Sequence, residues 1–209
     1  MALPQNLVGW MELTLKQLNG TRPTLLLHAC CGPCSSAVLE QLCQYFRITI
    51  LYYNPNIWPA EEYHRRWEEL RRFVQQAHPQ QVTLIEDEYD PQQFYAAVAG
   101  LEHEPERGAR CAVCYRQRME RAARYAKAHG YEWFATTLSI SPRKDAPLIN
   151  AIGRALEAEY GVKHLPNDFK KRGGYSRSLA LSEEYGLYRQ DYCGCEFSAR
   201  GSAAEASHT

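Results

Sequence analysis

Apolar residues along this chain follow two patterns that alternate with each other. Short continuous apolar runs, such as 24–29, are typical of strands that are buried on both faces of a sheet. Longer segments between these runs carry apolar positions at helical spacing. We expect strands at 24–29, 48–53, 82–86, 131–137 and 162–165, and helices at 5–19, 35–46, 60–76, 91–99, 111–129 and 146–160.

The order of these elements predicts an α/β fold, a three-layer parallel sheet with helices on both faces, as in Rossmann-like proteins. In such sheets the functional site lies at the carboxyl ends of the strands. We expect an amphipathic N-terminal helix extension at 1–20, a single α/β catalytic domain at 21–197 and a disordered tail at 198–209, where the sequence has no periodicity.

Composition and charge narrow the class of protein. The chain has 209 residues, of which 45% are hydrophobic, so it can form a core without disulfide staples. Its 24 basic and 24 acidic residues balance, so any nucleic acid would have to bind a local basic patch. We recognise no signal peptide and no membrane-spanning apolar run. We therefore expect a cytoplasmic protein with no membrane partner, in which clustered cysteines serve metal binding or catalysis.

Cysteines carry the clearest chemical signal. Seven of the eight fall in three closely spaced groups: Cys30, Cys31 and Cys34; Cys111 and Cys114; and Cys193 and Cys195. Thiolate ligands select iron–sulfur clusters, zinc or copper(I) over hard cations. The three groups therefore predict a metal or redox site where distant parts of the chain converge. Cys43 stands apart and is expected to be a small buried hydrophobic residue.

Spacing alone leaves three interpretations of the first two groups. Cys111 and Cys114 supply two thiolates from one turn, and Cys30 and Cys31 are suited to complete the four ligands of an iron–sulfur cluster. A structural zinc site is the second interpretation. The third is a thioredoxin-like dithiol in the sequence Cys31-Gly-Pro-Cys34.

The third group, Cys193-Gly-Cys195, has two interpretations of its own. Two cysteines separated by one residue form only a small, strained disulfide ring, and strained disulfides are the labile, catalytically useful ones. Alternatively, both thiolates ligate a metal.

Five motifs resemble those of a known family, the cobalamin-independent epoxyqueuosine reductases of the QueH type. They occur in order between Leu25 and Phe197: Leu27-His-Ala-Cys-Cys-Gly-Pro-Cys-Ser35, Tyr53-Asn-Pro-Asn-Ile57, Arg110-Cys-x-x-Cys-Tyr-x-x-Arg118, Thr136-Thr-Leu-x-x-Ser141 and Asp191-Tyr-Cys-Gly-Cys195. The resemblance implies a fold of the adenine-nucleotide α-hydrolase-like (HUP) group. It also implies two-electron removal of the epoxide oxygen of epoxyqueuosine at the tRNA wobble position, giving queuosine.

The same resemblance implies the cofactor and its ligands. It implies a [4Fe-4S] cluster held by Cys30, Cys31, Cys111 and Cys114. It leaves two roles for Cys193 and Cys195, either a redox-active disulfide or ligands to a second, mononuclear iron. Cys34 follows the first pair closely enough to approach that second metal. The electron donor is a partner that the sequence does not identify.

Reduction of an epoxide to an alkene and water takes two electrons and two protons. We expect Cys193, Cys195 and Asp191 to be catalytic. The candidate proton sources at the rim of the sheet are His28, Tyr115, Asp145, Tyr175 and Asp191. Each of these has a simpler interpretation. A histidine on a buried strand is often a satisfied core residue, and an aspartate before a helix often caps it. The alternative for Tyr115, Tyr175 and Asp191 is that they are ordinary packing or surface residues.

Basic loops are the candidate tRNA surface. Arginines and lysines beside an aromatic residue suit phosphate contact together with base stacking on a single-stranded loop. The residues expected to bind the nucleic acid are Arg116, Arg143, Lys144, Lys170, Lys171, Arg172, Tyr175 and Arg177. The arginines of 60–76, Arg66 among them, are accompanied by glutamates and are expected to form only a solvated face.

Two other classes of protein compete with the reductase. An ATP-dependent tRNA-modifying enzyme of the same fold would need a glycine-rich phosphate loop after the first strand, where this chain has Cys30-Cys-Gly-Pro-Cys34. A zinc-stabilised RNA-binding module without catalysis would contain zinc and no iron.

Overall fold

Five parallel strands form a single sheet in the order β3-β2-β1-β4-β5 in the computed structural model, which describes residues 6–199. This is the strand order of Rossmann-like folds. The strands are β1 (Thr24–His28), β2 (Arg47–Tyr52), β3 (Val82–Glu86), β4 (Trp133–Thr136) and β5 (Lys163–His164).

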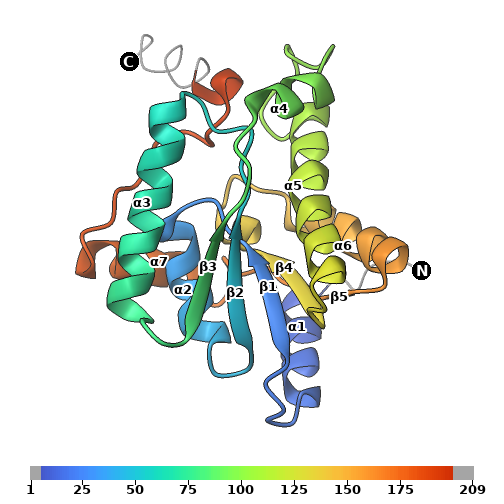
Figure 1. The fold of residues 1–209 in the computed structure, drawn as a ribbon, viewed down its shortest axis with the longest axis vertical. Helices are drawn as coiled ribbons and strands as arrows, with labels where there is room; N and C mark the ends of the chain where they lie inside the picture. The colour runs from blue at the N-terminus through green and yellow to red at the C-terminus, as the bar shows by residue number, and fades with distance from the viewer. Residues whose placement is uncertain (1–5, 200–209) are drawn as a thin grey trace.

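Helices cover both faces of this sheet, with α2, α3 and α7 on one side and α5 and α6 on the other (Figure 1). The helices are α1 (Leu7–Gln17), α2 (Gly32–Leu42), α3 (Ala60–Ala77), α4 (Pro91–Ala97), α5 (Ala109–Ala128), the 3-10 helix η1 (Thr137–Ile140), α6 (Ala146–Tyr160) and α7 (Gly174–Glu184). The three-layer parallel α/β fold predicted from the sequence is confirmed.

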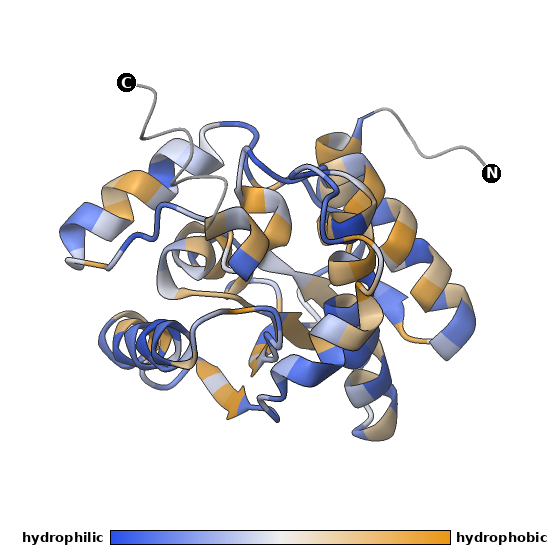
Figure 2. Ribbon diagram, turned by 90° about the horizontal axis from the view of Figure 1, so that it is seen from above, coloured by the Kyte–Doolittle hydropathy of each residue, from blue (hydrophilic) through white to orange (hydrophobic). Residues whose placement is uncertain are grey.

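Strand β1 shows why the sheet needs two helical layers. Leu25 and Leu27 belong to the core on the α2 side, whereas Leu26, which points to the opposite face, belongs to the core on the α5 side. All three are fully buried, because successive side chains of a strand point to opposite faces. Seen from above, hydrophobic and hydrophilic positions alternate around the helices, as expected where one side of each helix is buried (Figure 2).

Three differences from the sequence prediction bear on the site. Helix α2 begins at Gly32, three residues earlier than predicted, because Cys31 is its N-cap. Helix α7 (Gly174–Glu184), which the sequence analysis missed, packs on α2. The predicted tail also begins too early, because Ser198 is buried in a helical turn whose backbone N–H bonds to the Cys195 carbonyl. Residues 200–209 of the predicted tail lie outside the described residues.

Candidate metal and redox site

The first cysteine group lies at the carboxyl end of β1 and the N-terminus of α2. The sulfur atoms of Cys30, Cys31 and Cys34 all lie within 4.8 Å of one another. The Cys31 sulfur accepts a hydrogen bond from the Cys34 backbone N–H at 3.4 Å and thereby caps the helix. Because unpaired N–H groups and the helix dipole favour negative charge here, this end of α2 stabilises thiolates.

Electrostatics within this group favour one ionised thiol. Hydrogen bonds from Cys31 and Cys34 hold the pKa of the Cys30 thiol well below its ordinary value. The pKa of Cys34 is raised, first by its hydrogen bonds with Cys30 and Cys31 and then by burial. The side-chain N–H of Gln190 donates to the Cys31 sulfur at 3.2 Å. Three soft donors with a shared negative charge are the donor set that an iron–sulfur or zinc site needs.

The second group, Cys111 and Cys114, is buried in the first turns of α5. The backbone N–H of Arg107 donates to the Cys111 sulfur at 3.3 Å. Burial raises the pKa of the Cys114 thiol to about 11. Cys114 and Cys195 belong to the same small apolar cluster, so the third group lies beside the second. The tight group of three sulfurs does not include Cys111 or Cys114 among residues 6–199.

A glycine turn holds the third group in place. The backbone N–H of Trp58 donates to the Gly194 carbonyl at 2.8 Å, and Arg66 Nη1 donates to the Cys193 carbonyl at 3.3 Å. Gly194 has φ +126°, and a Cβ there would lie 2.8 Å from Arg66 Nη1. A left-handed conformation and a close approach therefore both require glycine between Cys193 and Cys195. All the described cysteines are free thiols.

Three buried cations surround these thiols. Arg66 and Arg118 are each 1% exposed, and Lys144 is 7% exposed. The sequence placed Arg66 on a solvated face, which is wrong, because its guanidinium turns inward to Glu62 and Cys193. The sequence also grouped Lys144 with surface cations, whereas its ammonium is buried and donates a hydrogen bond to the Cys193 sulfur.

A pocket of about 340 Å³ opens beside the cysteines. Cys30, Cys34 and Cys193 contribute to its wall, so thiols from two groups that are distant in sequence reach the same space. The opposite wall is formed by the segments after β4 and around α7, with Asp191 from the third cysteine motif. The other polar and aromatic lining residues include Arg143, Lys144, Tyr175, Arg189, Gln190 and Tyr192.

The candidate proton sources do not share one environment. His28 is fully buried, with Nδ1 2.9 Å from Thr136 Oγ1 and Nε2 3.1 Å from the Tyr53 carbonyl. Burial first, and then Arg118, lowers the pKa of His28 to about 4, so it is a neutral core histidine. The Asp145 side chain accepts the Leu148 backbone N–H at 3.0 Å and caps α6. Neither residue lines the pocket.

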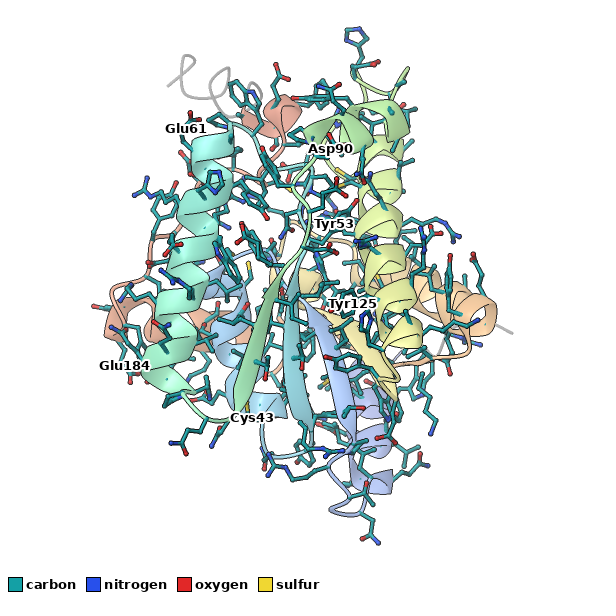
Figure 3. The ribbon with its side chains drawn as sticks, viewed as in Figure 1. Cys43, Tyr53, Glu61, Asp90, Tyr125 and Glu184 are labelled. Atoms are coloured by element: carbon teal, nitrogen blue, oxygen red, sulfur yellow. The ribbon has the colours of Figure 1, made fainter. Side chains whose placement is uncertain are left out.

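Tyr115, Tyr175 and Asp191 remain as candidate proton sources. Tyr175 and Asp191 line the pocket. The Tyr115 hydroxyl is buried and has no hydrogen-bond partner among the described residues, and the Lys144 ammonium lies 5.3 Å from its ring centroid. Figure 3 shows Tyr53 between α3 and α5, and Cys43 far from it at the opposite end of the sheet. Cys43 is buried in the apolar core, as expected.

The residues expected to bind nucleic acid are spread over several loops and helices. Arg143 is exposed, lines the pocket and donates to the Asp191 carbonyl at 3.1 Å. Lys171 is exposed. Four of the other cations are engaged in ion pairs: Arg116 with Glu120 and Glu159, Lys170 with Asp168, Arg172 with Glu12, and Arg177 with Glu40.

Two residues of the candidate site, Gln190 and Arg189, were not predicted from the sequence. Gln190 bonds to Cys31, and the Arg189 guanidinium lies 5.9 Å from the Tyr175 ring centroid at the pocket wall. The only signal was their position directly before the motif that begins at Asp191. Single polar residues without a repeated spacing give no pattern that predicts a partner 159 positions away.

Fold and site together define a class, a parallel α/β protein whose thiols converge on one pocket, as in metal-dependent redox enzymes. The family model "Epoxyqueuosine reductase QueH" matches residues 25–201. The chain belongs to this epoxyqueuosine reductase QueH family, and the resemblance seen in its motifs is confirmed.

Curated relatives carry the same description. The epoxyqueuosine reductase QueH of Staphylococcus epidermidis is 45% identical over 87% of this chain and 78% of its own length. That of Thermotoga maritima is 38% identical over 84% of this chain and 90% of its own. A solved structure, the U34-tRNA thiolase NcsA from Methanococcus maripaludis with its [4Fe-4S] cluster, aligns over 96% of this chain and 75% of its own, with 14% identity and a TM-score of 0.49. Within residues 6–199, no helix has the length and apolar character that crossing a bilayer requires.

Proposed function

We propose that this protein reduces epoxyqueuosine in tRNA to queuosine, with electrons delivered through a thiolate-bound iron–sulfur centre. The observation that carries the proposal is that Cys30, Cys34 and Cys193 open into one pocket of about 340 Å³. A space of this size suits a modified nucleobase that has been turned out of a single-stranded loop. The reaction converts an epoxide, two electrons and two protons into an alkene and one water.

The donor set fits the expected cofactor. Soft thiols from three groups, a helix N-terminus beside Cys31 and buried guanidinium N–H groups without partners on Arg66 and Arg118 all favour an anionic thiolate centre. We propose Cys30, Cys31, Cys111 and Cys114 as the ligands of a [4Fe-4S] cluster, which would supply the electrons when bound. For Cys193 and Cys195, the hydrogen bond from Lys144 to the Cys193 sulfur supports a thiolate. Ligation of a second iron is the role that would use such a thiolate directly, and Cys34, which lines the same pocket as Cys193, would be a further ligand.

The chain's own residues position the substrate and move protons. Tyr175 and Arg189 present a ring and a guanidinium at the pocket wall, which suits stacking against a base. Tyr115 is protonated at neutral pH, as an ordinary tyrosine is, and its hydroxyl has no hydrogen-bond partner among the described residues, so it is a candidate to donate a proton. Asp191 in the wall of the pocket is suited to relay a second proton from water.

The tRNA body is proposed to lie across the exposed cations around the pocket. Arg143 and Lys171 are exposed, and Arg143 belongs to the pocket wall itself. Contacts from such side chains to phosphates orient the nucleic acid without reading its sequence. The cations that form ion pairs within the protein complete this surface where their carboxylate partners give way to phosphate: Arg116, Lys170, Arg172 and Arg177.

One preparation tests the proposal against its two rivals. Protein purified without oxygen is analysed for iron, acid-labile sulfide and zinc, and is then incubated with tRNA containing epoxyqueuosine and a chemical reductant. We expect about four irons and four sulfides per chain and a nucleoside product lighter by one oxygen. Zinc without sulfide would favour the RNA-binding module, and turnover that depends on ATP would favour the other enzyme class.

The same analysis of iron and sulfide tests whether a second iron is bound. If Cys193 and Cys195 ligate it, the Cys193→Ser variant loses the iron in excess of the cluster and keeps the sulfide. If they form a redox disulfide instead, iron content is unchanged and the reduced protein has two more reactive thiols than the oxidised protein.

A further inference from the structure

Arg118 is a buried cation without a carboxylate partner. Its Nε donates to the Cys114 carbonyl at 3.3 Å and its Nη1 to the Asn54 side-chain oxygen at 3.4 Å, and both acceptors are neutral. Its Nη2 has no partner among residues 6–199. Burying a charge is costly unless an opposite charge lies nearby. The fold of this chain therefore holds a positive charge whose compensation does not come from an acidic side chain.

The neighbouring Arg66, unlike Arg118, has a carboxylate partner. Arg66 is equally buried, but its Nε donates to a carboxylate oxygen of Glu62 at 2.6 Å, within one turn of α3. That pair is neutral as a unit. Arg118, on α5, has no such partner in the described part of the chain, although both guanidiniums face the cysteines.

Lys144 is a second buried cation without a carboxylate partner among the described residues. Its ammonium is buried, donates to the Cys193 sulfur and lies over the Tyr115 ring, and no carboxylate among residues 6–199 pairs with it. Two uncompensated buried cations thus face the same group of thiols from two different elements, helix α5 and the loop before α6.

Arg118 lies beside two of the thiol groups. Its Nε donates to the backbone carbonyl of Cys114, and Asn54, which accepts from its Nη1, donates in turn to the Ala29 carbonyl next to Cys30. An anionic centre held by these thiols would neutralise both cations, and each cation would stabilise every added negative charge.

We infer that Arg118 and Lys144 are built-in counter-charges that raise the reduction potential of the thiolate-bound metal centre, an inference that rests on the proposed function. Reduction adds an electron to a buried anionic centre. A fixed cation in a low-dielectric interior stabilises the reduced form more than the oxidised form. Solvent does not screen these cations, because the protein excludes water from them.

The test compares reduction potentials in matched variants. Arg118→Gln removes the charge and keeps a hydrogen-bonding side chain, and Arg118→Lys keeps the charge. Arg124→Gln makes the same change at an exposed position on the same helix. Anaerobic redox titration, followed by visible absorbance and electron paramagnetic resonance, gives the midpoint potential of each protein. We expect a more negative potential in Arg118→Gln, and potentials close to that of the unmodified protein in the other two.

Several outcomes would decide against the inference. An unmodified protein without iron and sulfide would overturn the proposed function and this inference with it. An unmodified protein with the cluster, and the same potential in Arg118→Gln, would overturn the inference alone. If Arg118→Gln does not retain the cluster, retention in Arg118→Lys supports the counter-charge, whereas loss in both variants shows that guanidinium shape, and not charge, is required. Lys144→Gln and Lys144→Arg provide the same comparison at the second cation.

Discussion

The ammonium of Lys144 donates a hydrogen bond to the sulfur of Cys193, 49 positions further along the chain. The contact joins the loop after β4 to the C-terminal segment, and both border the pocket. It links a basic residue expected at the surface to the third cysteine group, and so it connects the candidate metal site with the wall of the proposed substrate pocket.

Replacing Lys144 by methionine should lower the rate of epoxyqueuosine reduction by about 10- to 100-fold, because a charge-assisted hydrogen bond to a reacting centre is lost. Affinity for tRNA should change little, since the ammonium is buried. Nucleoside mass spectrometry gives the rate, and a filter-binding assay gives the dissociation constant. A parallel loss of affinity, with the rate at saturation preserved, would instead assign Lys144 to tRNA binding.

Gly194→Ala should destabilise the protein by about 1–3 kcal/mol, because the residue is left-handed and its new Cβ approaches Arg66. Gly130→Ala is the matched control. Gly130 also has a positive φ, but a Cβ there has nothing within 4 Å, so its cost should be about 1 kcal/mol. Chemical denaturation of both variants measures the difference. Equal losses would mean that the turn adjusts without clashing with Arg66.

The pH dependence of stability should contain a contribution from His164. Burial lowers the pKa of this histidine to about 3, and neither ring nitrogen has a hydrogen-bond partner among the described residues. Because the folded pKa lies below the unfolded value of about 6.5, the contribution is complete above pH 6.5 and is lost as the pH falls toward 3. At pH 5 the loss is roughly 2 kcal/mol.

His164→Phe should remove this dependence at little cost at neutral pH, since no hydrogen bond is broken and the ring still packs on Phe134. Urea denaturation of the metal-free protein at pH 7 and pH 5 gives the four free energies of unfolding. If the variant and the unmodified protein lose the same stability between the two pH values, another group carries the effect.

Much of this fold follows from local sequence pattern. Segments 82–86 and 146–160 were predicted with the bounds that the structure gives, because apolar periodicity and end signals coincide there. Helix α7 was missed because its sequence, with Gly173 and Gly174 at its start and few apolar residues, resembles a loop. Its packing on α2, a contact that local sequence does not reveal, supports the helix.

Within the candidate site, the sequence predicted the cysteines but not the buried cations beside them. The cysteines were found because closely spaced thiols are rare and chemically specific. Arg66 and Lys144 were misjudged because local sequence shows only that they are charged. Their burial depends on Glu62 and Cys193, and the approach of Cys193 is set by the path of the C-terminal segment.

Exposed Arg143 should contribute to tRNA affinity. Arg143→Ala should weaken binding several-fold and should reduce the slope of log affinity against log salt by about 1, if the side chain contacts one phosphate. Arg71→Ala on α3, where Arg71 pairs with Glu68 outside the pocket wall, is the control and should leave the slope unchanged. Binding measured at several salt concentrations gives both slopes, and identical slopes for the two variants would place the tRNA elsewhere.

Tyr115→Phe tests the proposed proton donor with the smallest change available. The Tyr115 hydroxyl has no hydrogen-bond partner among residues 6–199, so its removal should not lower stability or cluster content. If this hydroxyl donates a proton in the reaction, turnover should fall by about 10²–10⁴-fold. Iron and sulfide content, thermal unfolding and single-turnover rates are measured on the same preparation. Loss of rate with the cluster and stability intact identifies a proton donor, whereas unchanged turnover would transfer the role to Asp191 or Tyr175 in the pocket wall.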